Sequence, residues 1–149
     1  SIPRPVCAAP SYLKRMGTPK TPEDLKNHAC LIYTLSTSPY DWKFKAGNKT
    51  VTVRVKGSIQ SNNGQFLMTF LHAGMGIALL PDFAVGEVIR SGKLKRILDD
   101  YPTEPHDLYL VYPANRHQSP KLRAFMDMGA EHLPPQCDRA AAEHRREKR

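Results

Sequence analysis

Residues 61–81, SNNGQFLMTFLHAGMGIALLP, decide the fold because they hold a helix start, an amphipathic helix, a tight turn and a buried strand in succession. Residues 61–63 are typical N-cap residues, and four apolar residues follow at helical spacing: Phe66, Leu67, Phe70 and Leu71. Gly74 and Gly76 are expected to end this helix. Ile77 to Leu80 lacks polar alternation, which is typical of a strand buried on both faces. This succession predicts an α/β protein.

Further elements are expected on both sides of this stretch. Buried strands are predicted over residues 6–9, 30–33 and 108–112, with an edge strand over 94–98. Helices are predicted over residues 12–16 after a Ser11 cap, from a Thr21 cap to near His28, from Pro81 to Gly92, and from Ser119 to Leu133. The last helix carries an apolar line that needs a partner: Leu122, Phe125, Met126 and Leu133.

Two alternating runs, residues 42–45 and 51–55, flank a Gly47-Asn48 turn and predict a β-hairpin with one wet face. Residues 57–60 are expected to extend its second strand. Because buried strands and helices alternate along the chain, the fold class is α/β, with a mixed sheet, helices on both faces and the hairpin at one edge.

Composition restricts the classes of protein to which the chain can belong. The 149 residues are 40% hydrophobic and 24% charged, which is typical of a soluble globular domain. The apolar runs are far shorter than the roughly 20 residues of a membrane-spanning helix, and the N-terminus shows no signal peptide. The net charge of +8 favours nucleic acid or small anions as partners. A charge that serves only solubility is an equal alternative, since no dense basic stripe appears.

Signatures of catalysis, metal binding and cofactor binding are lacking in the sequence. There is no nucleophile elbow, phosphate-binding loop or His-Glu-x-x-His motif, so no catalytic residue is assigned. The six histidines show no ligand spacing on one helix, and no Cys-x-x-Cys occurs, so no metal site and no cofactor are expected. Cys7 and Cys30 lie in apolar stretches and are predicted to be small hydrophobes; a redox role for them or for Cys137 stays open.

The strongest candidate for ligand binding is Ser61-Asn62-Asn63-Gly64. A helix N-terminus offers unpaired N–H donors and the positive end of the helix dipole, which together bind a carboxylate or phosphate. Gly64 would let a ligand approach the backbone. Plain helix capping is the alternative role, and it is the more common one for such residues.

Several short motifs follow one another along the chain: VCAAPSYL (6–13), GTPKTPEDL (17–25), HACL (28–31), WKF (42–44), SNN (61–63), AGMGIALLP (73–81), LVYP (110–113) and SPKLRAF (119–125). Over residues 4–133 their order resembles the second half of a LysR-type transcriptional regulator. The resemblance implies a type II periplasmic-binding-protein-like effector domain, in which two α/β lobes enclose a ligand in the cleft between them.

This resemblance also implies a division of the chain. Residues 1–113 would form the second lobe with its crossovers, and residues 114–135 the helix that returns to the first lobe. Residues 136–149 would be a disordered basic tail. The N-terminal winged helix-turn-helix and most of the first lobe would be missing from this sequence.

The effector-facing residues implied by the resemblance are Ser61, Asn62, Asn63, Gly64, Pro81 and Phe83. The expected partner is a small-molecule effector, for which the positive helix start favours an anion. DNA would bind through the missing N-terminal domain and not through this fragment. The protein would be a cytoplasmic homodimer or homotetramer without a membrane partner. A solute-binding protein or a small-ligand enzyme of the same fold is the alternative, and the lack of a nucleophile–base pair argues against the enzyme.

Overall fold

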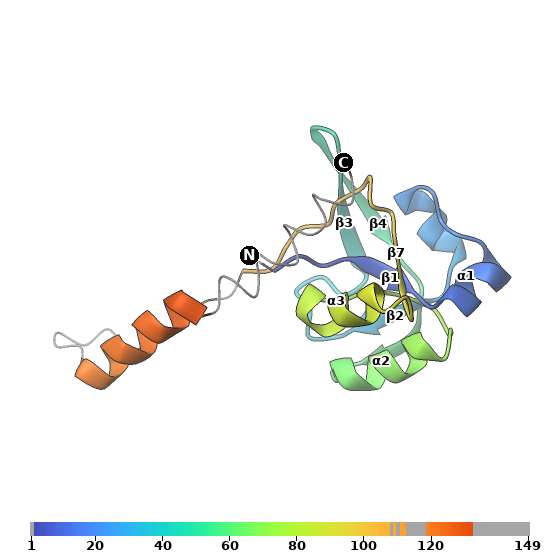
Figure 1. Cartoon of the computed structure of the whole chain (residues 1–149). Helices are drawn as coiled ribbons and strands as arrows, with labels where there is room; N and C mark the ends of the chain where they lie inside the picture. Colours follow the sequence, from blue (N-terminus) through green and yellow to red (C-terminus); the bar gives the residue numbers. More distant parts are fainter. Residues whose placement is uncertain (1, 108, 110, 113–118, 133–149) are drawn as a thin grey trace.

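A five-stranded sheet in the order β5-β2-β6-β1-β7 lies at the centre of the fold (Figure 1). The computed structural model describes residues 2–107, 109, 111–112 and 119–132. The strands of the central sheet are β1 (Val6–Ala8), β2 (Cys30–Tyr33), β5 (Gly57–Ser61), β6 (Ile77–Leu79) and β7 (Lys95–Ile97). A separate two-stranded sheet consists of β3 (Asp41–Ala46) and β4 (Lys49–Arg54). The helices are α1 (Pro10–Met16), the 3₁₀ helix η1 (Pro22–Asn27), α2 (Gly64–His72), α3 (Asp82–Arg90) and a helix over residues 120–132.

The central sheet is mixed, as the sequence predicts. Strand β2 pairs in parallel with β5 and β6, whereas β1 pairs antiparallel with β6 and β7. Alternate residues of the central strands enter two different cores, because side chains of a strand point to opposite faces. Val6 and Ile32 belong to one core, and Cys7 and Leu31 belong to the other. This burial on both sides explains why these strands show no polar alternation.

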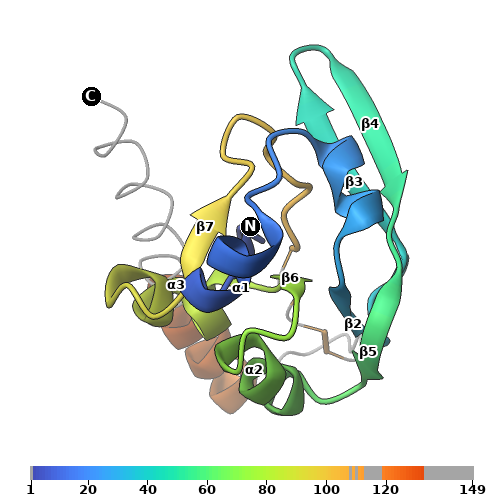
Figure 2. The same ribbon diagram turned by 90° about the vertical axis from the view of Figure 1, so that its right-hand side faces the viewer.

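Each face of the sheet has its own cover. Leu67, Leu71 and Val85 of α2 and α3 pack on one face. The other face is covered by α1, η1 and the hairpin, through Tyr12 and Leu25 among others. Figure 2 shows the hairpin and α2 at different sides of the central strands. The prediction of a mixed sheet with helices on both faces is therefore confirmed.

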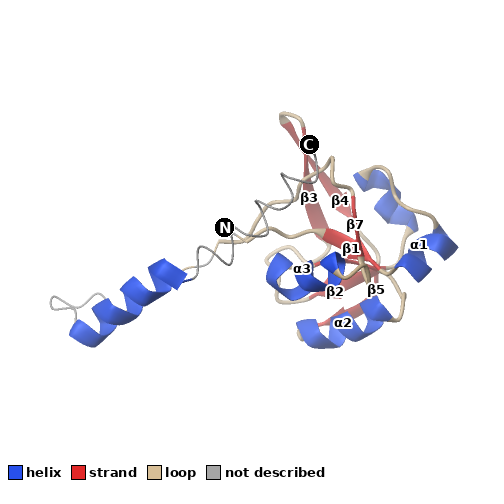
Figure 3. Cartoon of the chain, in the orientation of Figure 1, coloured by secondary structure: helices blue, strands red, loops and turns tan. Residues whose placement is uncertain are grey.

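The hairpin differs from the prediction, because it lies over a face of the sheet and not at its edge (Figure 3). Its apolar side chains Trp42, Phe44 and Val53 are at most 4% exposed and pack into the core shared with β1 and β2. Residues 57–60 do not extend β4 but belong to β5. The chain changes sheets at residues 55–56, where the Val55 N–H donates to the Tyr40 carbonyl and the Lys56 carbonyl accepts from the Cys30 N–H.

One helix start and the buried face of another helix also differ from the prediction. Helix α1 begins at Pro10, so Ser11 lies inside the helix and is not its cap. Ser11 instead contacts the turn after α2: a side chain at Gly74, where φ is +68°, would lie 2.5 Å from its Oγ. In α2 the buried residues are Leu67, Met68 and Leu71, whereas Phe66 is 50% exposed. The start of η1 is as predicted, with the Asp24 carboxylate accepting from the Thr21 N–H at 2.9 Å.

The predicted strand over residues 108–112 is not formed at the positions that the structure describes. Tyr109 and Val111 are 76% and 90% exposed. The described residues 109, 111 and 112 lie away from the central sheet, whose edges are β5 and β7, and pair with none of its strands (Figure 1). A strand without a hydrogen-bonding neighbour is not stable by itself.

The helix over residues 120–132 starts as predicted, with Ser119 Oγ accepting from the Leu122 N–H at 3.2 Å. It stands apart from the central sheet (Figure 1), and Phe125 is 53% exposed. Leu133 and the predicted tail over 136–149 lie outside the described residues. In the described part of the chain, none of the helices has the length and apolarity to span a bilayer.

Candidate functional site

The carboxyl ends of β5, β2 and β6 meet at one edge of the central sheet, because these neighbouring strands are parallel. Three segments follow at this edge: residues 61–64 after β5, residues 34–38 after β2, and residues 80–83 after β6. In open α/β sheets, ligands bind outside the carboxyl ends of parallel strands. The topology therefore brings two of the predicted groups, Ser61–Gly64 and Pro81–Phe83, to the edge where a ligand is expected.

Hydrogen bonds at the start of α2 show how residues 61–64 are held. Asn63 Oδ1 accepts from the Gln65 and Phe66 N–H groups at 2.9 and 3.2 Å, and Ser61 Oγ accepts from the Asn63 N–H at 3.0 Å. Both side chains thus accept hydrogen bonds from backbone N–H groups that were expected to be free to bind a ligand. Asn62 is exposed, and a Cβ at Gly64 would contact nothing within 4 Å. The groups open to a ligand are therefore the Asn62 side chain and the backbone at Gly64.

Pro81 and Phe83 start α3 at the other side of the same edge. Pro81 occupies the N-cap position, and the Asp82 N–H donates to the Pro3 carbonyl at 2.8 Å. The Phe83 side chain is 78% exposed, so a large aromatic ring faces outward beside this edge. Since β5 and β6 both flank β2, the two strands that lead to these groups are two strand spacings, or roughly 10 Å, apart.

Cavities in the described structure involve residues that the sequence analysis did not select. One cavity of about 280 Å³ lies between the loop after β2 and the start of β3. Its polar lining includes Arg4, Ser36, Thr37, Glu104 and His106. None of the six predicted residues lines this cavity. None of them lines the two other cavities, of about 550 and 460 Å³, either. The sequence offered little reason to select Arg4, because the residues that surround it come from segments roughly 30 to 100 positions away.

The environment of Arg4 is unusual for a cation. Its Nε is buried and has no hydrogen-bond partner among the described residues. Burial lowers the pKa of the Arg4 guanidinium below its ordinary value, whereas the nearby Glu104 carboxylate raises it. An arginine stays protonated in proteins, so this site carries a positive charge that is partly desolvated.

The buried thiols are poor nucleophiles. Burial raises the pKa of Cys7 to about 12, with a smaller opposing effect of Arg96, and burial raises that of Cys30 to about 12. Thiols with such pKa values stay protonated and unreactive near neutral pH. Both residues belong to the hydrophobic cores, as predicted, while Cys137 lies outside the described residues. Within the described ranges, no three His, Cys, Asp or Glu residues are grouped as a metal site would need.

Comparisons with known proteins agree on one family. A model of the LysR substrate binding domain matches residues 1–134. The chain is 36% identical over 110 residues to an HTH-type transcriptional regulator of Haemophilus influenzae, covering 74% of this chain and 38% of that protein. It is 37% identical over 122 residues to the HTH-type transcriptional regulator YhjC of Escherichia coli, covering 80% of this chain and 41% of that protein.

Solved structures give the same result. The full-length virulence activator AphB of Vibrio cholerae superposes with a TM-score of 0.73 at 29% identity, covering 85% of this chain and 43% of that one. The regulatory domain of CrgA from Neisseria meningitidis superposes with a TM-score of 0.70 at 28% identity, covering 89% and 65%. The chain thus spans about 40% of the length of the curated relatives that it matches.

Proposed function

The chain belongs to the LysR substrate-binding domain family, and on that basis we propose that it is the ligand-sensing part of a DNA-binding transcriptional regulator. The observation that carries the proposal is the edge where β5, β2 and β6 end, which is a ligand-binding position in such sheets. A small effector bound there would shift the balance between two arrangements of the protein and so change transcription. The relatives are regulators, which favours this function over a solute-binding protein or an enzyme.

The proposed division of the chain has residues 1–113 as the second lobe with its crossovers, residues 114–135 as the helix that returns to the first lobe, and residues 136–149 as a tail. Three observations support it. Residues 109, 111 and 112 lie away from the central sheet, and the helix over 120–132 exposes Phe125 instead of packing on the lobe (Figure 1). The family match ends at residue 134, before the proposed tail.

The proposed effector site consists of Ser61, Asn62, Asn63, Gly64, Pro81 and Phe83. In this site Asn62 and the backbone at Gly64 would hydrogen-bond the ligand, and Phe83 would contact its apolar part. Ser61 and Asn63 would act by holding the start of α2 in place. The positive end of the α2 dipole favours a carboxylate or phosphate as the ligand group.

Two further partners, DNA and other copies of the same protein, are proposed from the family to which the relatives belong. DNA would bind through an N-terminal helix-turn-helix domain, since the relatives are HTH-type regulators and the chain spans about 40% of their length. The intact protein would act in the cytoplasm as a homodimer or homotetramer, because LysR-type regulators pair through their effector domains.

Titration of small carboxylates into the intact protein tests the proposed site. Asn62→Ala should lower the affinity by roughly 10- to 150-fold, the value of a hydrogen bond to a charged group at about 1.5–3 kcal/mol. Asn48→Ala is the matched control, because Asn48 is exposed in the hairpin turn between β3 and β4. An unchanged affinity for Asn62→Ala, with NMR shifts clustered away from residues 61–64 and 81–83, would overturn the proposed site.

A further inference from the structure

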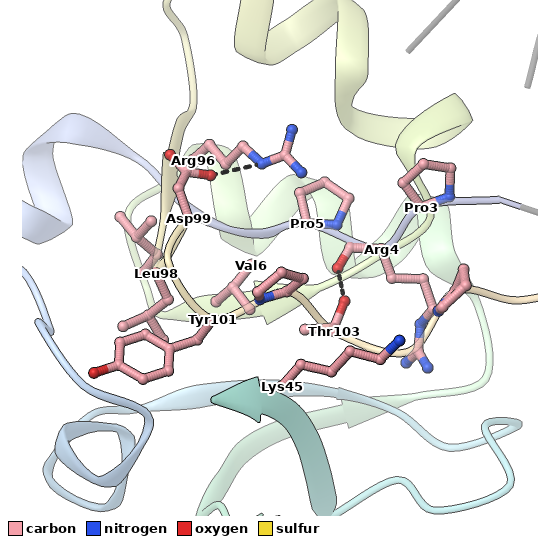
Figure 4. A pocket seen from close by; sticks show the side chains of 13 residues that line it. Pro3, Arg4, Pro5, Val6, Lys45, Arg96, Leu98, Asp99, Tyr101 and Thr103 are labelled. Atoms are coloured by element: carbon pink, nitrogen blue, oxygen red, sulfur yellow. Dashed lines mark hydrogen bonds and ion pairs between the residues drawn. The ribbon is translucent and has the colours of Figure 1, made fainter. Parts of the chain in front are cut away.

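The cavity of about 550 Å³ is lined by none of the six proposed effector residues, although Pro3 in its wall accepts a hydrogen bond from the Asp82 N–H, which lies between Pro81 and Phe83. Its walls come from four segments: residues 3–6 leading into β1, residues 96–99 of β7 and its end, residues 101–105, and Lys45 of β3. Figure 4 shows these side chains around the cavity. Its size falls within the range of small-molecule sites, roughly 300–1,000 Å³.

Much of the lining is apolar. The contributing side chains are Pro3, Pro5, Val6, Leu98, Tyr101 and Pro102. These side chains come from segments that are fixed by hydrogen bonds. The Thr103 hydroxyl donates to the Arg4 carbonyl, and the Lys45 N–H donates to the Pro102 carbonyl at 2.8 Å. The cavity is therefore preformed, which reduces the entropic cost of binding.

The charged lining has an excess of cations. Three basic side chains, Arg4, Lys45 and Arg96, face a single carboxylate, that of Asp99. Arg96 and Asp99 neutralise each other through an ion pair with 2.9 Å between Nε and Oδ1. The lining residues thus carry a net charge of about +2, from Arg4 and Lys45, and the Glu104 carboxylate next to the cavity offsets part of the Arg4 charge.

Neither of these two cations forms an ion pair with a described residue, although the Glu104 carboxylate lies near Arg4. The Arg4 Nε is buried without a hydrogen-bond partner in the described structure, and such a group is costly unless something binds it. Lys45 forms no ion pair with any described residue, and its side chain extends in the direction of the Arg4 guanidinium in Figure 4. A carboxylate between them would form charge-assisted hydrogen bonds, the stronger kind in proteins.

We infer that this cavity binds a small organic anion, whose carboxylate contacts Arg4 and Lys45 and whose apolar body lies against Leu98 and Tyr101. Such a ligand would contact both segments that leave the lobe. These segments already pair through hydrogen bonds between Ile2 and His106, of 2.6 and 2.9 Å. Binding would stiffen their pairing, and the site uses none of the six proposed effector residues.

The test uses the 149-residue chain and three probes: cyclohexanecarboxylate, the neutral cyclohexanecarboxamide and inorganic sulfate. We expect saturable amide shifts in residues 97–105 with the carboxylate. The carboxamide, which lacks the charge, and sulfate, which lacks the apolar body, should each bind at least about tenfold more weakly. Equal binding of carboxylate and carboxamide would overturn the inference.

Variants separate this site from the effector site. Arg4→Met and Lys45→Met should each weaken carboxylate binding by about tenfold or more, since each removes a charged partner but keeps an apolar stem. Lys45 is exposed, so its replacement keeps the test valid even if Arg4→Met fails to fold. Lys49→Met is the control, because Lys49 starts β4 at the hairpin turn and does not line the cavity. Shifts centred on residues 61–64, or full affinity in both cavity variants, would contradict the inference.

Discussion

The charge of Asp24 couples the start of η1 to pH. Its carboxylate accepts from the Thr21 and Lys20 N–H groups at 2.9 and 2.8 Å, at the start of η1. These hydrogen bonds, first that of Thr21 and then that of Lys20, lower the pKa of Asp24 below 3.8. Because the folded-state pKa is depressed, the stabilisation is present above the unfolded pKa and is lost as the pH falls through the folded value.

Asp24→Asn should therefore be less stable than the parent chain at pH 6, and the difference in the free energy of unfolding should shrink as the pH falls below 3.8. Urea denaturation at several pH values measures this difference. Glu23→Gln, at the neighbouring exposed position, is the control and should show a smaller effect. A difference that stays constant from pH 6 to pH 2 would show that the Asp24 charge does not stabilise η1.

Residue roles set by near neighbours in the sequence could be predicted. The Thr21-Pro22-Asp24 start of η1 and the Asn63 cap of α2 depend on residues two to four positions apart. The exposure of Phe66 could not be predicted from near neighbours. The rotation of α2 about its axis is set by packing on β2, which is distant in the sequence. Periodicity placed Phe66 on the same face as Leu67, and only contact with the sheet selected Leu67, Met68 and Leu71.

At the scale of elements, the helix over residues 120–132 differs from the other described helices, because it stands apart from the central sheet (Figure 1). Phe125 is 53% exposed, and Leu122 and Met126 lie on the same side at helical spacing. Their burial against a second copy would contribute on the order of 4–9 kcal/mol, at about 1.5–3 kcal/mol for each of these three side chains. The costs of association are of similar size, so a modest affinity is expected.

The 149-residue chain is therefore predicted to self-associate through this helix, and sedimentation velocity over a concentration series measures it. Phe125→Asp should shift the chain toward monomer, because it places a charge in the apolar face. Ala124→Asp adds the same charge on the opposite side of the helix and should have little effect. A monomer at high concentration would contradict the prediction, as would association that Phe125→Asp leaves unchanged.

Element types were easier to predict than the partners of each element. Alternation identified both strands of the hairpin, but it did not show that Trp42 and Phe44 pack onto the face of another sheet. Apolarity likewise suggested a strand over residues 108–112, although no strand of this chain lies beside that segment in the described structure. Strand formation depends on a neighbour, which local sequence does not reveal.

At the scale of the whole molecule, the order of motifs was sufficient to predict the family and the α/β fold. The same order implied that residues 61–64 and 81–83 share a ligand-binding edge, and the parallel strands bring both groups to one edge. The cavity at Arg4 and Lys45 was not predicted. Its lining combines the first residues with residues 45 and 96–105, which the fold alone brings together.

The central claim, that this chain is the sensing part and not the DNA-reading part of a regulator, is tested most directly by DNA binding. Fluorescence anisotropy would compare the intact protein and the 149-residue chain on the DNA upstream of its own gene and on scrambled DNA. We expect sequence-selective binding by the intact protein only. The +8 chain should bind both DNAs weakly and equally, with an affinity that falls as salt rises. Tight, sequence-selective binding by the 149-residue chain alone would contradict the account.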